Sequence, residues 1–250
     1  MDGALFQKLK KQVGKAVGDF NLIAEGDRIA VGVSGGKDSY TLLHILEELR
    51  RRAPVRYELV AVNVDSGFPG FRKEVIAKYL ADHGFESRME STNCYEIIEE
   101  KRRPGTSYCS FCARLRRGVL YTLADQLGCN KIALGHHLDD FIETLLLNQF
   151  YSGSLKAMSP KLQADNGRHV VIRPLVYVEE GDIIRFSREQ GFPVICCACP
   201  VCGDVDQKRK RMKLLIRELT SENPHLKKSM ISSLGNVQPR HLLDKSLADF

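Results

Sequence analysis

The stretch Ser34-Gly35-Gly36-Lys37-Asp38-Ser39 has the residue types and spacing of a loop that holds phosphate groups. It follows Ile29–Val33, a short apolar run typical of a buried strand, and precedes Tyr40–Leu49, whose apolar spacing indicates a helix. Two adjacent glycines let the backbone approach an anion, and the unpaired N–H groups of the new helix attract the same anion. The stretch therefore predicts a phosphate site between a strand and a helix, and ATP cleavage is the first hypothesis.

Two common nucleotide-binding patterns do not fit this loop. Val31 stands where the Walker A pattern has its first glycine, and Asp38 follows the lysine where that pattern has Ser or Thr. The dinucleotide-binding pattern fails at Ser34. The remaining pattern, SGGxDS, resembles the loop of the PP-loop ATPases, which split ATP between the α and β phosphates and leave AMP on a substrate oxygen. An ordinary glycine-rich turn is the alternative, and the hydrophobic strand in front of the loop argues against it.

The side chains at this loop suggest how such a reaction is assisted. Lys37 would neutralise charge on the departing pyrophosphate, and Asp38 would help to place Mg²⁺. Asp139 and Asp140 follow another expected strand and could bind a metal or take a proton from a base, with helix N-capping as the alternative. The residues expected to be catalytic are Lys37, Asp38, Asp139 and Asp140. Those expected to bind the nucleotide are Val33, Ser34, Gly35, Gly36, Lys37, Asp38, Ser39, Asp65, Gly135 and His136; for His136, a packed histidine at a strand end is the alternative.

The length and composition are those of a protein with a sizeable core. The chain has 250 residues, of which 43% are hydrophobic, and no segment approaches the roughly 20 apolar residues that span a membrane. Met1–Phe20 shows a basic amphipathic helix pattern rather than a signal peptide, so we expect a cytoplasmic protein with no membrane partner. In that compartment the eight cysteines indicate metal binding or sulfur chemistry rather than structural disulfides.

Basic residues gather beside two groups of cysteines. The net charge is +6. The basic residues concerned are Lys101, Arg102, Arg103, Arg114, Arg116 and Arg117 around one cysteine pair, and Lys208, Arg209, Lys210, Arg211 and Lys213 after the other. A polyanion as partner would explain both clusters, so we expect nucleic-acid binding, with solvated helix faces as the alternative.

Strands and helices alternate along the chain. The expected strands are Ile29–Val33, Tyr57–Asn63, Phe85–Met89, Lys131–Gly135 and Val170–Arg173, and the expected helices are Leu5–Val17, Tyr40–Leu49, Phe71–His83, Cys94–Lys101, Arg114–Leu127, Phe141–Tyr151 and Glu179–Gln190. This order predicts an α/β fold with a doubly wound, Rossmann-like parallel sheet. Ligands of such sheets bind at the carboxyl ends of the strands, where the loop, Asp65 and Gly135–Asp140 would converge.

The composition changes after Pro193, where a cysteine-rich stretch leads into basic residues and two short helical patterns separated by Pro224. We expect three parts. These are an N-terminal basic helix at 1–27, a PP-loop ATPase domain at 28–192 that includes the first cysteine pair, and a cysteine-rich, basic helical extension at 193–250.

Four of the cysteines form two CxxC pairs, Cys109 with Cys112 and Cys199 with Cys202. A structural Cys₄ zinc site is one hypothesis, although zinc ribbons usually bring their pairs together within about 15 to 20 residues. An iron–sulfur cluster is equally compatible with these thiolates, and three ligands would leave one iron with an open position. A redox dithiol is a third possibility. Cys94 and Cys129 stand alone and are expected to be core residues.

Several further motifs make the chain similar to one family. The motifs are Ser34–Ser39, Cys109–Gly118 (CSFCARLRRG), Ala133–Asp140 (ALGHHLDD), Leu147–Tyr151, Ile172–Leu175 (IRPL) and Asn236–His241. Together they resemble the TtcA family, the tRNA-cytidine(32) 2-sulfurtransferases, over about residues 28 to 244. The segments with Arg-Leu-Arg-Arg-Gly and Gly-His-His-x-Asp-Asp are more specific than the phosphate loop alone.

The resemblance implies a reaction and a set of cofactors. ATP adenylates the C2 carbonyl oxygen of a tRNA cytidine, and a sulfur species held by a 4Fe-4S cluster displaces AMP. The cluster ligands that carry over are Cys109, Cys112 and Cys202, since Cys202 is the cysteine followed by Gly203. The implied cofactors are ATP, Mg²⁺ and the 4Fe-4S cluster. The implied partners are tRNA, a cysteine desulfurase or another sulfur donor, and a second copy of the chain in a homodimer.

The chain departs from the family near the third ligand. Cys196, Cys197, Cys199 and Cys202 crowd together where the family usually has a single pair, so Cys199 competes with Cys202 for that role. Three other functions stay open: 2-thiouridine synthesis by the same chemistry, a PP-loop ligase with a structural zinc site, and a zinc-stabilised RNA-binding module without catalysis.

Overall fold

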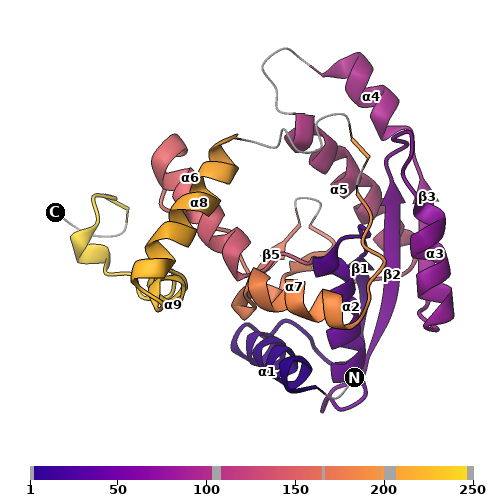
Figure 1. The fold of residues 1–250 in the computed structure, drawn as a ribbon, viewed down its shortest axis with the longest axis horizontal. Helices are drawn as coiled ribbons and strands as arrows, with labels where there is room; N and C mark the ends of the chain where they lie inside the picture. The colour runs from indigo at the N-terminus through magenta and orange to yellow at the C-terminus, as the bar shows by residue number, and fades with distance from the viewer. Residues whose placement is uncertain (1–2, 103–107, 165–166, 197, 200–206, 247–250) are drawn as a thin grey trace. The chain divides into compact units, whose positions relative to one another are not determined.

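The computed structural model describes residues 3–102, 108–164, 167–196, 198–199 and 207–246 (Figure 1). They form a six-stranded sheet of order β3-β2-β1-β4-β6-β5. Its strands are β1 Asp27–Gly32, β2 Tyr57–Asp65, β3 Ser87–Ser91, β4 Lys131–Ala133, β5 Lys161–Gln163 and β6 Val170–Ile172. Every neighbouring pair is parallel except β5 with β6, which is antiparallel. The predicted α/β class is confirmed, and the short edge strand β5 is an addition that the sequence did not predict.

The helices follow the order expected for a doubly wound sheet. They are α1 Ala4–Asp19, α2 Lys37–Arg50, α3 Lys73–Asp82, α4 Cys94–Lys101, α5 Tyr108–Gln126, α6 Leu138–Ser152, α7 Glu180–Glu189, α8 Gln207–Glu222 and α9 Leu226–Ser233, with short 3-10 turns at Pro174–Tyr177 and Pro239–His241. Figure 1 shows α3 and α5 on opposite sides of the sheet. Because the chain crosses from β1 outward to β3 and then returns to β4, the strand order reverses between β1 and β4, where such sheets bind their ligands.

Apolar residues on alternate positions of the strands build the core. Val60, Val62 and Val64 of β2 pack with Leu120 and Leu123 of α5 in one buried cluster. Their neighbours in the strand point to the other face because side chains alternate along a strand. The predicted core positions of Cys94 and Cys129 are confirmed, with exposed fractions of 3% and 4%.

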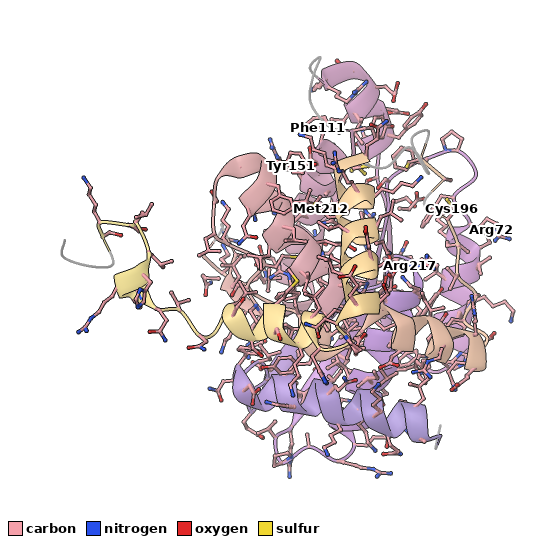
Figure 2. The ribbon with its side chains drawn as sticks, turned by 60° about the vertical axis from the view of Figure 1, so that its left-hand side comes forward. Arg72, Phe111, Tyr151, Cys196, Met212 and Arg217 are labelled. Carbon is pink, nitrogen blue, oxygen red and sulfur yellow. The ribbon has the colours of Figure 1, made fainter. Side chains whose placement is uncertain are left out.

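The chain divides into two compact units, Met1–His137 with Ser159–Val205 and Leu138–Met158 with Asp206–Phe250. The first contains the sheet, and the second contains α6, α8 and α9. The second unit has a small core of its own, in which Leu138 and Ile142 of α6 meet Met212 and Ile216 of α8. Met212 is labelled in Figure 2. The three-part domain division expected from the sequence stays a prediction.

No helix among the described residues has both the length and the apolar character needed to cross a lipid bilayer.

Candidate active site

The phosphate loop leads from the end of β1 into the first turn of α2. Val33 continues the pairing with β2, since its N–H donates to the carbonyl oxygen of Val62 at 2.8 Å. Gly36 is the N-cap residue of α2, and the Ser39 hydroxyl donates to its carbonyl oxygen at 2.8 Å. The first N–H groups of a helix have no partner within the helix, so the start of α2 offers donors to an anion.

Lys37 lies between two carboxylates at this loop. Its Nζ is 3.1 Å from Oδ1 of Asp38 and 3.2 Å from Oε1 of Glu180 at the start of α7. Burial acts to lower the pKa of Lys37, but the charges of Asp38 and Glu180 outweigh it and raise the pKa above its usual value. Lys37 is therefore a fixed cation where the leaving phosphates are expected.

The segment after β4 approaches the same turn of α2. A Cβ atom added to Gly135 would lie 3.1 Å from the carbonyl carbon of Asp38, which explains why glycine occupies this position. Nε2 of the buried His137 is 3.8 Å from Oδ1 of Asp38. The structure therefore brings Gly135 to the nucleotide loop, as the sequence predicted for neighbouring strand ends.

The end of β2 supplies a turn and a hydroxyl. The carboxylate of Asp65 accepts a hydrogen bond from the N–H of Gly67 at 2.8 Å and lies 3.1 Å from Nζ of Lys73. Ser66, the next residue, lines the cavity described below. Asp65 is the last residue of β2, and its carboxylate stabilises the turn that follows the strand.

The loop and the cysteines share one cavity of about 280 Å³. Ser34 and Gly36 of the loop form part of its wall, and Cys109, Cys112 and Cys199 form another part. Both members of the first CxxC pair lie within α5, which begins at Tyr108 rather than after the pair. Residues of the predicted phosphate loop and thiol groups, which are far apart in the sequence, therefore meet within the first unit.

The surroundings of the thiols are partly apolar and partly polar. Phe68, Ile98 and Tyr108 form a buried cluster against which Cys112 and Cys199 pack. Burial raises the pKa of the Cys112 thiol, while the charge of Arg116 and a hydrogen bond with Ser66 act in the opposite direction. In the part of the chain that the structure describes, no three His, Cys, Asp or Glu side chains lie close enough to hold a single metal ion.

A backbone contact fastens the cysteine-rich segment to the phosphate loop. The N–H of Ile195 donates to the carbonyl oxygen of Gly35 at 3.0 Å. Gly35 has a φ of +86°, and a Cβ atom added to it would lie 2.6 Å from Cγ1 of Ile195. The exposed Cys196 is the next residue after Ile195 (Figure 2), and Cys199 follows three residues later. Cys202, the predicted third ligand, lies outside the described residues.

The two predicted catalytic aspartates belong to the second unit, at the start of α6. Oδ1 of Asp139 is 2.7 Å from Nζ of Lys227 in α9, and Oδ1 of Asp140 is 3.9 Å from Arg209 in α8. Lys208, also on α8, lies over the ring of Tyr151. The acidic side chains that the sequence offered as metal ligands or bases thus have basic partners within their unit.

Comparison with known proteins identifies the family. A model of the PP-loop domain matches residues 5–195. The chain is 68% identical to the tRNA-cytidine(32) 2-sulfurtransferase of Geobacter metallireducens over 247 residues, which are 99% of this chain and 96% of the relative. It is 66% identical to the protein of the same name from Syntrophotalea carbinolica, over 100% of this chain and 96% of the relative. The chain belongs to the tRNA-cytidine(32) 2-sulfurtransferase family.

A solved structure supports the fold of this family member independently. The U34-tRNA thiolase NcsA from Methanococcus maripaludis, solved with its 4Fe-4S cluster, superposes with a TM-score of 0.76 at 22% sequence identity, over 93% of this chain and 78% of that chain. At that identity the likeness shows the shared α/β fold.

Two residues of this sulfurtransferase family member were not predicted as site residues. Glu180 pairs with Lys37, and Arg173 donates to Nδ1 of His136 at 3.3 Å. Arg173 follows an apolar strand at the carboxyl edge, which is a signal that sequence reasoning could have used. Glu180 lies in an ordinary helix start, and nothing in the sequence connects it with Lys37.

Proposed function

We propose that this protein is an ATP-dependent tRNA thiolase that converts a cytidine of tRNA into 2-thiocytidine. The observation that carries the proposal is the single cavity whose wall contains both the phosphate loop and the thiols of Cys109, Cys112 and Cys199. An ATP-dependent ligase has no need of thiols at its nucleotide loop, and an RNA-binding module has no need of the loop. The family supports cytidine, rather than uridine, as the modified base.

The loop residues perform the activation step. A cytosine carbonyl oxygen leaves only after conversion to a phosphate ester, so the oxygen attacks the α-phosphate of ATP and pyrophosphate departs. Ser34–Ser39 binds the pyrophosphate through backbone N–H groups, and Lys37 neutralises its charge. Asp38 would be a ligand of the Mg²⁺ that accompanies ATP. Val33, Gly135 and His136 complete the nucleotide site at the strand ends, and Asp65 supports the turn that closes it.

The thiols fit an iron–sulfur cluster in their chemistry and placement. Cys109 and Cys112 lie about one turn apart on α5 and face the cavity that Cys199 also lines. They would hold a 4Fe-4S cluster together with a third cysteine, for which Cys202 is the family's ligand and Cys199 is the rival on this cavity. When bound, a cluster with three protein ligands supplies an iron with an open position for a sulfur atom. The apolar side chains of Phe68, Ile98 and Tyr108 would keep water away from that chemistry.

Basic residues of α8 would bind the tRNA backbone. Lys208, Lys210, Arg211 and Lys213 are exposed on this helix. Affinity should therefore fall steeply with salt, because each phosphate contact releases counterions. Asp139 and Asp140, whose ion pairs reach α8 and α9, stay predicted catalytic residues. A cysteine desulfurase or another sulfur donor, a homodimer and a cytoplasmic location also stay predictions.

The experiment that tests the proposal uses the full chain purified without oxygen. Iron and sulfide contents are measured, and thiolation of a tRNA transcript with Mg-ATP and sulfide is followed by mass spectrometry of the nucleosides. Cys112→Ala is compared with Cys129→Ala, which removes a buried thiol of the α5–β2 core. We expect about four iron atoms per chain and ATP-dependent 2-thiocytidine in the wild type and the control, with both lost in Cys112→Ala.

Two further variants decide the third ligand. Cys202→Ser should remove the iron if the family ligand operates here, whereas Cys199→Ser should remove it if the residue on the cavity does. A colourless, zinc-containing protein that fails to thiolate tRNA after anaerobic reconstitution would refute the proposal and favour a ligase or an RNA-binding module.

A further inference from the structure

Arg173 is a buried cation that none of the proposed steps uses. Arg173 is the first residue after β6, and it is 9% exposed. Nη1 donates to the carbonyl oxygen of Ser159 at 2.6 Å, and Nε donates to Nδ1 of His136 at 3.3 Å. Neither acceptor is a carboxylate, and within the described residues Arg173 has no ion pair. A buried arginine is ordinarily paired with an acid, so its charge requires another explanation.

A second cation adds to the positive charge. Burial lowers the pKa of Arg173, and the charge of Arg117 on α5 lowers it further. Arg117 is exposed and, among the described residues, has no carboxylate within ion-pair distance either. Like charges that interact raise the free energy of the empty site, and a bound anion would reverse that effect.

The position of Arg173 connects it with the phosphate loop. Ala133 of β4 and Ile172 of β6 are register partners, so the residues that follow them, including His136 and Arg173, emerge at the same edge of the sheet. Gly135 lies against the carbonyl group of Asp38 in the first turn of α2. One short segment therefore contacts the nucleotide loop at Gly135 and accepts a hydrogen bond from Arg173 at His136.

The same hydrogen bond fixes the tautomer of His136. A guanidinium group can only donate, so Nδ1 of His136 must be the unprotonated nitrogen. The ring proton then lies on Nε2, which makes this nitrogen a donor rather than an acceptor. Beyond these two contacts the guanidinium group of Arg173 can also only donate, which suits an oxyanion.

We propose that Arg173, with Arg117, binds a phosphate oxyanion at the carboxyl ends of β4 and β6. Two sources share this chemistry, the triphosphate of ATP and a phosphodiester of the tRNA. Both are substrates of the proposed function, on which the choice of these two sources rests. The site itself is tested by binding alone, so loss of thiolation for another reason would leave the test intact.

The experiment compares Arg173→Gln and Arg117→Gln with Arg52→Gln in the full chain. Arg52 follows the carboxyl end of α2 and pairs with Glu48, so its substitution removes one positive charge at the opposite edge of the sheet. The probes are α,β-methylene-ATP with Mg²⁺ and a tRNA transcript, each titrated at several salt concentrations. Near-ultraviolet circular dichroism and thermal unfolding show whether each variant is folded.

We expect Arg173→Gln to weaken one of the two probes by roughly 10- to 100-fold, as for the loss of a charge-assisted hydrogen bond in a buried place. Arg117→Gln should weaken the same probe by about two- to fivefold, and Arg52→Gln should change neither. Weaker binding of the ATP analogue identifies the triphosphate as the ligand. Weaker tRNA binding, with a salt slope reduced by about one, identifies a backbone phosphate.

The proposal is overturned if folded Arg173→Gln binds both probes like the wild type, or if Arg52→Gln weakens them equally. If Arg173→Gln fails to fold, the binding of both probes by Arg117→Gln provides the test, because Arg117 is exposed and its substitution should leave the fold intact. Wild-type binding of both probes by Arg117→Gln would then exclude an anion shared by the two arginines.

Discussion

The contact between Gly35 and Ile195 predicts that one added methyl group will disturb both halves of the site. Gly35 has a φ of +86°, a region in which a residue with a Cβ atom loses roughly 1–2 kcal/mol. The methyl of Gly35→Ala would also lie 2.6 Å from Cγ1 of Ile195 and 3.0 Å from Cδ1 of Ile76. Overpacking of this kind destabilises by about 1–3 kcal/mol. The expected total is therefore roughly 2–5 kcal/mol of folding free energy.

Thermal unfolding measures this loss, and the neighbouring glycine is a matched control. For a domain of this size about 1 kcal/mol shifts Tm by about 2–4 °C, so Gly35→Ala should lower Tm by roughly 4–20 °C. Gly36 has a φ of −85°, and a Cβ atom added to it would meet only Oγ of Ser34, at 3.4 Å. Gly36→Ala adds the same methyl to the same loop and should lose about 1 kcal/mol or less, as at other N-cap positions.

A double-mutant cycle separates the clash from the backbone strain. Ile195→Ala alone should lose roughly 2–4 kcal/mol because Ile195 is buried. In Gly35→Ala/Ile195→Ala the clash with Ile195 is absent and only the contact with Ile76 remains, so the double variant should be about 1–3 kcal/mol more stable than the sum of the single changes. Additivity within about 0.5 kcal/mol, or a Gly35→Ala variant as stable as Gly36→Ala, would refute the reasoning. Because Cys199 follows Ile195, Gly35→Ala should also retain less iron than Gly36→Ala.

Three further predictions concern single groups. Burial and the charge of a neighbouring histidine lower the pKa of His44 to about 4, below the unfolded value of about 6.5. The unfolded state therefore binds more protons, and urea unfolding should show up to roughly 3 kcal/mol of stability lost between pH 6.5 and 4, but a flatter profile in His44→Gln. Lys131→Met leaves the buried Asp27, 2.6 Å away in the native protein, without its cation and should destabilise by roughly 3–5 kcal/mol in urea unfolding. Lys37→Met should reduce pyrophosphate release by about 10²–10³-fold while Tm changes little, and an unchanged rate would remove Lys37 from the mechanism.

Most of the sheet could be predicted because its strands are apolar and its connections have helical periodicity. The parallel strands and α4 lie close to their predicted positions. β5 was missed because Lys161, Leu162 and Gln163 are all exposed, so the pattern lacks the alternation of a half-buried strand. The predicted start of α5 at Arg114 is too late, since the helix begins at Tyr108 and already includes Cys109 and Cys112.

Candidate site residues could be predicted where they lie in one continuous segment of the sequence. Contacts between residues that are distant in the sequence could not be predicted, because they depend on the fold. The phosphate loop was predicted from its glycines together with the apolar strand before it and the helix after it, and Gly35, with a φ of +86°, has a conformation that favours glycine. The partnership of Lys37 with Glu180 depends on how α7 packs against α2, which no local pattern encodes. The contact of Arg173 with His136 likewise depends on the register of β4 with β6.

The geometry also explains why a phosphate loop and a set of thiols can serve one reaction. In the proposed reaction, activation leaves AMP on the base, and sulfur must reach that same carbon before water does. A cavity bounded by Ser34 and Gly36 on one side and by Cys109, Cys112 and Cys199 on another would place the two half-reactions of the proposed function at one position. The hydrogen bond from the N–H of Ile195 to the carbonyl oxygen of Gly35 links the loop to the cysteine-rich segment through backbone atoms. A change in the conformation of Gly35 would break this hydrogen bond, so the loop and the segment that carries Cys199 support each other's structure.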